Sequence, residues 1–315
     1  MPTKVKKENK FLREFLEYLE IEKNRSILTI NNYRFYLTKF FEFTKITDPK
    51  EINLDKVRQF RIHLNRLVVK GKGLKKSTQN YYVIALRSFL KFLAKQDIKT
   101  MAPEKIELAR AESRQVDFLE EADLEKLLEA PIKAVEPEII KLRDKAILEL
   151  LFSAGLRVSE LANLKIDGLN LDKEEFTVRG KGDKLRVVFL SNQAKYALKS
   201  YIQARHDMEP WLFVSHDKAS AKREKKQSPS APLTPRSIQR LVEKYSTAVG
   251  IAKHVTPHTL RHSYATDLLL NGADIRSVQA MLGHASITTT QIYTHITNAQ
   301  LREVHKAFHG RKRKE

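Results

Sequence analysis

Four side chains that together could transfer a phosphoryl group lie in one short stretch, residues 255–295. They are His258, Arg261, His284 and Tyr293. An arginine guanidinium binds phosphate oxygens and keeps its charge at neutral pH. A histidine can donate to a phosphate oxygen or move a proton, and a tyrosine hydroxyl can attack phosphorus and carry a covalent intermediate. The set therefore predicts transfer of a phosphoryl group to a tyrosine without a metal ion.

Each of these residues alone has a simpler explanation. A single tyrosine on a helix usually belongs to the core or to the surface. An isolated pair such as His258 and Arg261 could cap a helix or lie on its exposed face. The prediction depends on all four residue types occurring together and on suitable partners upstream in the chain.

The apolar spacing of this stretch predicts the helices that must position the four residues. The apolar positions, at mostly four-residue intervals, are Leu260, Tyr264, Leu268 and Leu269. This period indicates a helix with His258 at its start and Arg261 about one turn later on the same face. A second helix is predicted over residues 273–282, and a glycine then frees the backbone just before His284. Tyr293 is predicted on a third short helix.

An arginine farther upstream could complete such a site. Gly155 follows a strongly apolar predicted helix over residues 141–153, and Arg157 precedes a helix predicted over 158–164. An arginine beside a glycine turn at a helix start suits a phosphate, because helix N-termini also attract anions. The simpler alternative is a surface arginine that pairs with Glu160.

A β-hairpin is predicted over residues 176–190, where two apolar strands flank a turn that contains two glycines. Lys181 lies between those glycines, at the tip. The spacing of a nucleotide-binding P-loop is missing. The turn is therefore either a solvated basic loop or the carrier of a proton-donating lysine, for which Lys184 is the second candidate.

Three segments resemble the active-site boxes of tyrosine recombinases. They are GLRVSELANL (155–164), HTLRHSYAT (258–266) and LGHASITTTQIYTH (282–295). Within that family the chain is most similar to the Xer type of chromosome-dimer resolvases, and the resemblance extends over about residues 10–308. It implies a metal-independent DNA strand transferase that needs no cofactor.

The resemblance also implies a fold class and a domain organisation. The fold would be mainly α with a small β-hairpin or sheet. A helical, SAM-like core-binding domain and a catalytic domain would together form a clamp on DNA. The expected boundaries are residues 1–102 for the core-binding domain, 103–117 for the linker and 118–298 for the catalytic domain. Residues 299–315 would be a C-terminal helix and basic tail that docks on a neighbouring subunit.

The individual roles follow from the resemblance as well. The residues matched to catalytic positions are Arg157, Lys181, His258, Arg261, His284 and Tyr293, with Glu160 in support. Tyr293 would attack the scissile phosphate and form a 3′-phosphotyrosyl link. The arginines and His284 would stabilise the transition state, and Lys181 would protonate the leaving 5′ oxygen. His258 would accept the tyrosine proton or make a second phosphate contact.

The charge of the chain agrees with a nucleic-acid partner. The 315 residues carry a formal net charge of +20, with a pI near 9.8, which favours a polyanion. Residues 1–105 hold 24 Lys and Arg against 11 Asp and Glu, whereas the remaining 210 hold 34 against 27. The candidates for DNA-backbone contacts are Lys75, Lys76, Arg87 and Lys91. A basic, proline-containing loop is predicted over residues 215–232.

Several other classes of site and protein are disfavoured. Without cysteine there is no disulfide, no thiolate zinc site and no thiol nucleophile. His254, His258 and His262 are spaced four residues apart, but the HExxH pattern of zinc helices is missing, so no metal site is predicted. No apolar run approaches the roughly 18 residues of a membrane span. We therefore expect a soluble cytoplasmic protein without a membrane partner.

The expected partner is a double-stranded DNA recombination site, bound by a homotetramer or heterotetramer on two duplexes. A DNA translocase is a further candidate partner.

A phage or transposon integrase is the nearest alternative function, although no additional N-terminal arm-binding domain is evident. From another class, a type IB topoisomerase would share the chemistry but would not need the docking helix. A non-catalytic DNA-binding protein would need the charge but not all the active-site residue types.

Overall fold

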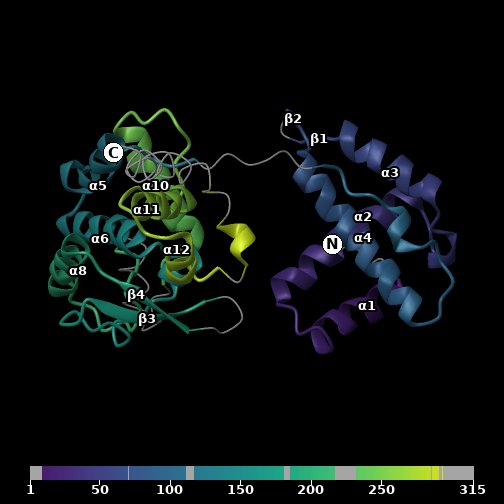
Figure 1. Ribbon diagram of the computed structural model, residues 1–315, viewed down its shortest axis with the longest axis horizontal. Coiled ribbons are helices and arrows are strands. Elements are labelled where there is room, and N and C mark those ends of the chain that lie inside the picture. Colours follow the sequence, from purple (N-terminus) through teal and green to yellow (C-terminus); the bar gives the residue numbers. More distant parts are fainter. Residues whose placement is uncertain are drawn as a thin grey trace, which may run out of the picture. The chain divides into compact units, whose positions relative to one another are not determined.

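The computed structural model shows a mainly helical protein with small antiparallel sheets (Figure 1). It describes residues 9–69, 71–110, 117–180, 185–216, 232–284, 286–290 and 293. The chain divides into two compact units, residues 1–113 and 114–315. These features confirm the predicted fold class, while the exact linker limits, 103–117, stay a prediction. In the parts of the chain that are described, none of the helices has the length and apolar content to cross a membrane.

Helix α4 is the central element of the N-terminal unit, and it packs on α1, α2 and α3 (Figure 1). The helices are α1 (Lys10–Ile21), α2 (Ile27–Thr44), α3 (Leu54–Arg66) and α4 (Lys76–Lys95). The first three begin after side chains that accept a backbone N–H of the first turn, Asn9, Ser26 and Asn53. The minor elements are η1 (Pro49–Glu51), β1 (Val68–Val69), β2 (Lys72–Gly73) and η2 (Pro103–Lys105).

Aromatic side chains form much of the core of this unit. Phe15, Phe40 and Phe89 are almost completely buried. The rings of Phe15 and Phe89 meet edge to face with centroids 5.4 Å apart, a favoured geometry for aromatic pairs. Tyr81 is an exception, since it is half exposed and stacks on Tyr36. The apolar periodicity of these helices therefore marks burial correctly.

Helix α6 is the central element of the second unit and contacts α5, α8, α10 and α11. The helices are α5 (Glu121–Lys133), α6 (Glu138–Ala154), α7 (Val158–Ala162), α8 (Asn192–Ala204), α10 (Pro235–Ala248), α11 (Pro257–Leu270), α12 (Ile275–Leu282) and η3 (Ile287–Thr289). Ile147, Leu148, Leu150 and Leu151 on α6 are fully buried although they point in different directions around the helix. A helix that is buried over so wide a face must be covered by several neighbours, and this position fixes the end of α6, where the site begins.

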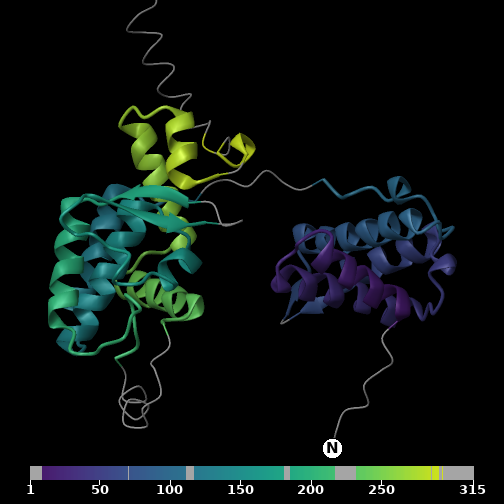
Figure 2. The same cartoon turned by 90° about the horizontal axis from the view of Figure 1, so that it is seen from below.

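The predicted hairpin is confirmed as strands β3 (Glu175–Arg179) and β4 (Leu185–Phe189). The strands are antiparallel, and Val178 pairs with Arg186. Strand β4 contacts α6 and α12, and Figure 2 shows the hairpin beside the yellow α12. The turn that contains Lys181 and Lys184 lies outside the described residues, as do residues 217–231 of the predicted basic loop and the predicted C-terminal helix.

Helix α11 begins where its sequence indicates. The side chain of Thr256 accepts the N–H of Thr259, and Pro257 occupies the first helical position, where a missing N–H costs nothing. The predicted placement of His258 at the helix start is therefore confirmed. His254 precedes the helix, so it does not share a helical face with His258 and His262.

Gly155 connects α6 to the arginine that follows, and its conformation requires glycine. Its φ is +55°, and an added Cβ would lie 2.4 Å from Cδ1 of the Tyr264 ring.

We expect Gly155→Ala to lower the free energy of unfolding by about 2–4 kcal/mol, from backbone strain plus overpacking. The matched control is Gly250→Ala, at φ +75° with open space around its Cβ position, for which we expect a loss of about 1–2 kcal/mol from backbone strain alone. Chemical denaturation of both variants checks this, and equal losses would contradict the steric argument.

Candidate active site

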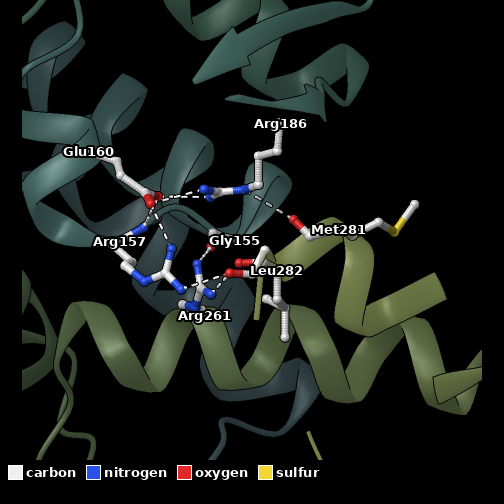
Figure 3. Close-up of polar contacts among 8 residues, drawn as sticks. Gly155, Arg157, Glu160, Arg186, Arg261, Met281 and Leu282 are labelled. Atoms are coloured by element: carbon white, nitrogen blue, oxygen red, sulfur yellow. Dashed lines mark hydrogen bonds and ion pairs between the residues drawn. The ribbon is translucent and has the colours of Figure 1, made fainter. Parts of the chain in front are cut away.

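Two arginines from different elements bind one carboxylate (Figure 3). Arg186, on β4, makes a two-pronged contact with Glu160, with Nη1–Oε1 and Nη2–Oε2 distances of 2.9 and 2.7 Å. Arg157 adds an Nη1–Oε1 contact of 2.7 Å. The side chain of Glu160 is only 5% exposed, so these charge-assisted bonds lie in a largely desolvated environment, where they are stronger than at the surface.

Glu160 also caps the helix on which it lies. It is the third residue of α7, and its Oε2 accepts the backbone N–H of Arg157 at 2.8 Å. A carboxylate at this position satisfies a free N–H and interacts favourably with the positive end of the helix. Burial alone would raise the pKa of Glu160, but the hydrogen bonds from Arg186 and Arg157 outweigh it and lower the pKa to about 2. The carboxylate is therefore charged throughout the neutral range.

The C-terminal end of α12 holds three guanidinium groups in place. The last carbonyls of a helix have no partner within it and carry partial negative charge. Here they accept hydrogen bonds from arginines on three separate elements, as Figure 3 shows. The pairs are Arg186 Nε to Met281 O (3.2 Å), Arg261 Nη2 to Leu282 O (2.6 Å) and Arg157 Nη2 to Gly283 O (3.1 Å).

Arg261, on α11, is the most deeply buried of the three arginines that meet α12. It is 5% exposed, and its Nη1 donates to the carbonyl oxygen of Gly155 at 2.5 Å. Burial, followed by the charge of Arg157, lowers its pKa to about 10. Arg261 therefore keeps its charge near neutral pH, and the Gly155 turn and the end of α12 fix its orientation.

His284 follows the left-handed glycine that ends α12. Gly283 has a φ of +63°, and the carbonyl oxygen of His284 accepts from Gln279 Nε2 at 3.1 Å. The His284 Nδ1 atom lies 3.0 Å from Oγ1 of Thr290. Burial and then the charges of Arg261 and Arg157 lower the pKa of His284 to about 4. The imidazole is therefore neutral at pH 7.

His258 and Tyr293 are not hydrogen-bonded to each other. The pKa of His258 is lowered by partial burial and then by the charges of Arg261 and Arg157. Tyr293 is 1% exposed, and its hydroxyl oxygen is 2.5 Å from Nδ1 of His262. Burial raises the pKa of Tyr293 to about 12, against the opposing effect of Arg261. The phenol is therefore protonated in this state.

The structure brings most of the sequence-predicted residues together. Arg157 and Arg261 meet at the end of α12, with Glu160 bound to Arg157 and His284 directly following α12. Lys181 lies outside the described residues. The candidates for DNA contacts lie in the other unit, at the start of α4 and along it, where Lys75, Lys76 and Lys91 are exposed and Arg87 is partly buried. Their roles stay predictions.

Two residues of the site were missed by sequence reasoning, Arg186 and His262. Arg186 shares the inward face of β4 with the buried Val188, and a charged residue at an inward strand position signals a buried partner. His262 lies four residues after His258, on the same helical face. Both signals are present in the sequence, but neither identifies the partner.

The arrangement suits an anion with several oxygen atoms. The site holds three guanidinium groups and one carboxylate, which binds two of them, so a surplus of two positive charges remains. Because the backbone carbonyls hold these groups in fixed orientations, they need little reorganisation to stabilise negative charge that develops at a reacting centre.

Comparisons with known proteins agree on one family. Residues 117–300 match the phage integrase family, and residues 12–97 match the N-terminal SAM-like domain of phage integrases. The chain is 35% identical over 308 residues to tyrosine recombinase XerD of Oceanobacillus iheyensis, covering 95% of this chain and 98% of that protein. It is 38% identical over 298 residues to tyrosine recombinase XerA of Pyrococcus horikoshii, covering 93% and 91%.

Solved structures give the same result. A crystal structure of XerA recombinase has a TM-score of 0.51 at 32% identity and covers 96% of this chain and 99% of that chain. XerH site-specific recombinase, in a post-cleavage complex with its palindromic difH substrate, has a TM-score of 0.70 at 25% identity, covering 93% and 83%.

The lowered pKa of Glu160 predicts a pH-dependent contribution to stability. Its pKa falls from 4.5 to about 2 on folding, so the stabilisation is complete above about pH 5 and is lost as the pH falls toward 2. We expect Glu160→Gln to lower the free energy of unfolding by about 1–3 kcal/mol at pH 7, and by progressively less toward pH 3. Urea unfolding at several pH values measures the difference in free energy of unfolding between the variant and the wild type. A difference that does not change with pH would contradict this assignment. The control is Glu174→Gln, at an exposed glutamate.

Proposed function

The chain belongs to the phage integrase family and is a tyrosine recombinase of the Xer type, and on this premise we propose that it exchanges DNA strands at a specific site through a 3′-phosphotyrosyl intermediate. The observation that carries this proposal is the cluster of three guanidinium groups, from the start of α7, from α11 and from β4, that are fixed at the end of α12. The Tyr293 hydroxyl is bound to His262 on α11. The positive charge would bind the scissile phosphate, and the hydroxyl would supply the nucleophile.

The proposed cleavage step replaces one phosphate ester with another. The Tyr293 oxygen forms a bond to phosphorus while the bond from phosphorus to the 5′ oxygen breaks. Lys181 gives a proton to the leaving 5′ oxygen, and His258 accepts the phenol proton, one of the two roles that the resemblance implies for it. Arg157, Arg261 and His284 stabilise the additional negative charge of the transition state. Attack by the 5′ hydroxyl of a partner strand then reverses the reaction, with no net loss of ester bonds.

The protonation states of the site agree with this division of roles. His284 is neutral at pH 7 because its pKa is about 4, and its Nδ1 is next to the Thr290 hydroxyl. Its Nε2 is therefore the ring atom that can reach a phosphate. Arg261 remains charged, with a pKa of about 10. Fixed positive charge thus comes from the arginines, and the imidazole contributes a hydrogen bond.

The proposed partner is a double-stranded recombination site. The net charge of +20 and the basic N-terminal unit support it, and the contacts of Lys75, Lys76, Arg87 and Lys91 with the DNA backbone belong to this proposal. The XerH relative was solved on its difH substrate. By analogy with Xer relatives, we place four subunits, identical or of two kinds, on two duplexes. Resolution of chromosome dimers, with a translocase as activating partner, is the proposed cellular role.

We expect Tyr293→Phe to bind DNA as the wild type does and to form no covalent adduct, because only the attacking oxygen is removed. Protein-bound DNA would be captured under denaturing conditions from fragmented genomic DNA of the source cell and sequenced, with both proteins run side by side. Adducts at one chromosomal site in the wild type alone would support dimer resolution. Adducts at the ends of a mobile element would indicate an integrase, and adducts in the variant would rule out Tyr293.

The role of Lys181 predicts a specific chemical rescue. We expect Lys181→Ala to slow cleavage by about 10²–10⁴-fold, the usual contribution of a general acid. A substrate with sulfur in place of the bridging 5′ oxygen should restore most of the rate, because a thiolate leaves without protonation. Single-turnover adduct formation on both substrates measures this. Lys184→Ala is the matched control, and rescue of that variant instead would transfer the role to Lys184.

A further inference from the structure

The hydroxyl of Tyr293 is held by a histidine for which the resemblance implies no role. Its oxygen lies 2.5 Å from Nδ1 of His262, and the two ring centroids are 5.6 Å apart with a 60° tilt. The phenol ring is 1% exposed. It packs in a small apolar cluster with residues of α11 and α12, Tyr264, Ala265, Leu269, Val278 and Leu282. The contact therefore lies at the polar edge of an apolar pocket.

Helix α11 places this histidine beside the phosphate-binding groups. His258, Arg261 and His262 are at positions i, i+3 and i+4, and side chains at these spacings share one face of a helix. His262 directly follows Arg261, whose guanidinium is fixed by the end of α12. A hydroxyl bound to His262 is therefore tied to the same helix that carries two of the groups expected to hold the phosphate.

The protonation states give the hydrogen bond its direction. Burial and then the charges of His258 and Arg261 lower the pKa of His262 to about 4, although Asp117 opposes them. The pKa of Tyr293 is raised to about 12. At neutral pH the phenol therefore donates, and the neutral imidazole accepts through Nδ1, which places the ring proton on Nε2.

His258 is the other histidine that could serve the hydroxyl. No hydrogen bond joins it to Tyr293 in the described part of the chain, and the charges that act most on its ring are those of Arg261 and Arg157. The neighbour of the nucleophile is His262.

We propose that His262 is a positioning residue, whose Nδ1 fixes the Tyr293 hydroxyl beside Arg261 so that it is oriented before the scissile phosphate arrives. The proposal rests on the proposed role of Tyr293 as nucleophile. The apolar pocket holds the phenol ring but, within the described residues, offers its hydroxyl no polar partner other than His262, so the O–H bond would otherwise rotate about the C–O bond. A single directional hydrogen bond to Nδ1 removes that freedom. Orientation of this kind accelerates the chemical step without contributing to substrate binding.

The test compares His262→Ala with His262→Asn. The Oδ1 atom of asparagine takes nearly the place of Nδ1 and accepts a hydrogen bond, but it does not take up a proton at neutral pH. Asparagine therefore restores a positioning role and does not restore a proton-accepting one. His254→Ala, at an exposed histidine before α11, is the matched control for removal of an imidazole.

The rate of adduct formation and the Kd for DNA would be measured on a nicked duplex that carries the site recovered by adduct capture. We expect His262→Ala to lower the single-turnover rate of adduct formation about 10–100-fold, with the Kd for DNA and the unfolding midpoint unchanged. His262→Asn should recover most of the rate, and His254→Ala should match the wild type. In the free protein, the Tyr293 ring carbon resonance, identified by its loss in Tyr293→Phe, should shift in the alanine variant and return in the asparagine variant.

The outcomes separate this inference from the function on which it rests. A wild-type protein that forms no Tyr293-dependent adduct would overturn both. Normal adduct formation by His262→Ala would overturn the inference alone. An asparagine variant as slow as the alanine variant would also overturn it, since His262 would then transfer the proton.

Discussion

Three guanidinium groups in one small site repel one another, and the architecture of the second unit depends on how that repulsion is offset. Two kinds of acceptor offset it. The Glu160 carboxylate binds two of the groups, and the carbonyls at the end of α12 bind all three. Charges of one sign in a partly desolvated site are costly unless opposite charge and hydrogen bonds accompany them. The carboxylate supplies the charge, and the helix end supplies acceptors that carry no full charge of their own.

This arrangement makes the site dependent on backbone geometry at two glycines. Gly155 turns the chain between α6 and Arg157, and its carbonyl oxygen accepts from Arg261. Gly283 ends α12 in the left-handed conformation and exposes its carbonyl to Arg157. An added Cβ at Gly283 would lie 2.8 Å from Cδ of Arg186. The Tyr264 ring at Gly155 and the Arg186 side chain at Gly283 therefore leave these turns no room for a larger residue.

Apolar periodicity was enough to predict the hairpin and the helices that carry the site, because burial of one face or of the whole element decides them. The predicted ends of the helices were less accurate. Helix α6 begins at Glu138 after Pro137, three residues before the predicted start, so the prediction left out Ile139 and Ile140 although they continue the apolar pattern. The site was predicted where residues lie close in sequence. The partners of Arg186 and His262 are 26 and 31 residues away, and spacing alone cannot select one carboxylate or one tyrosine among many.

The proposed roles of the histidines depend on the protonation state of the site. His284 and His262 are neutral, and Tyr293 is protonated, because burial and neighbouring arginines disfavour positive charge on imidazole and burial disfavours negative charge on phenol. A phosphate in the proposed site would add negative charge and would compensate the arginines, which raises imidazole pKa values. Because the pKa values of both histidines are about 4 in the free protein, they can rise by roughly one or two units and still leave the imidazoles neutral at pH 7. The low starting values therefore preserve Nδ1 of His262 as an acceptor for the phenol when the scissile phosphate is bound.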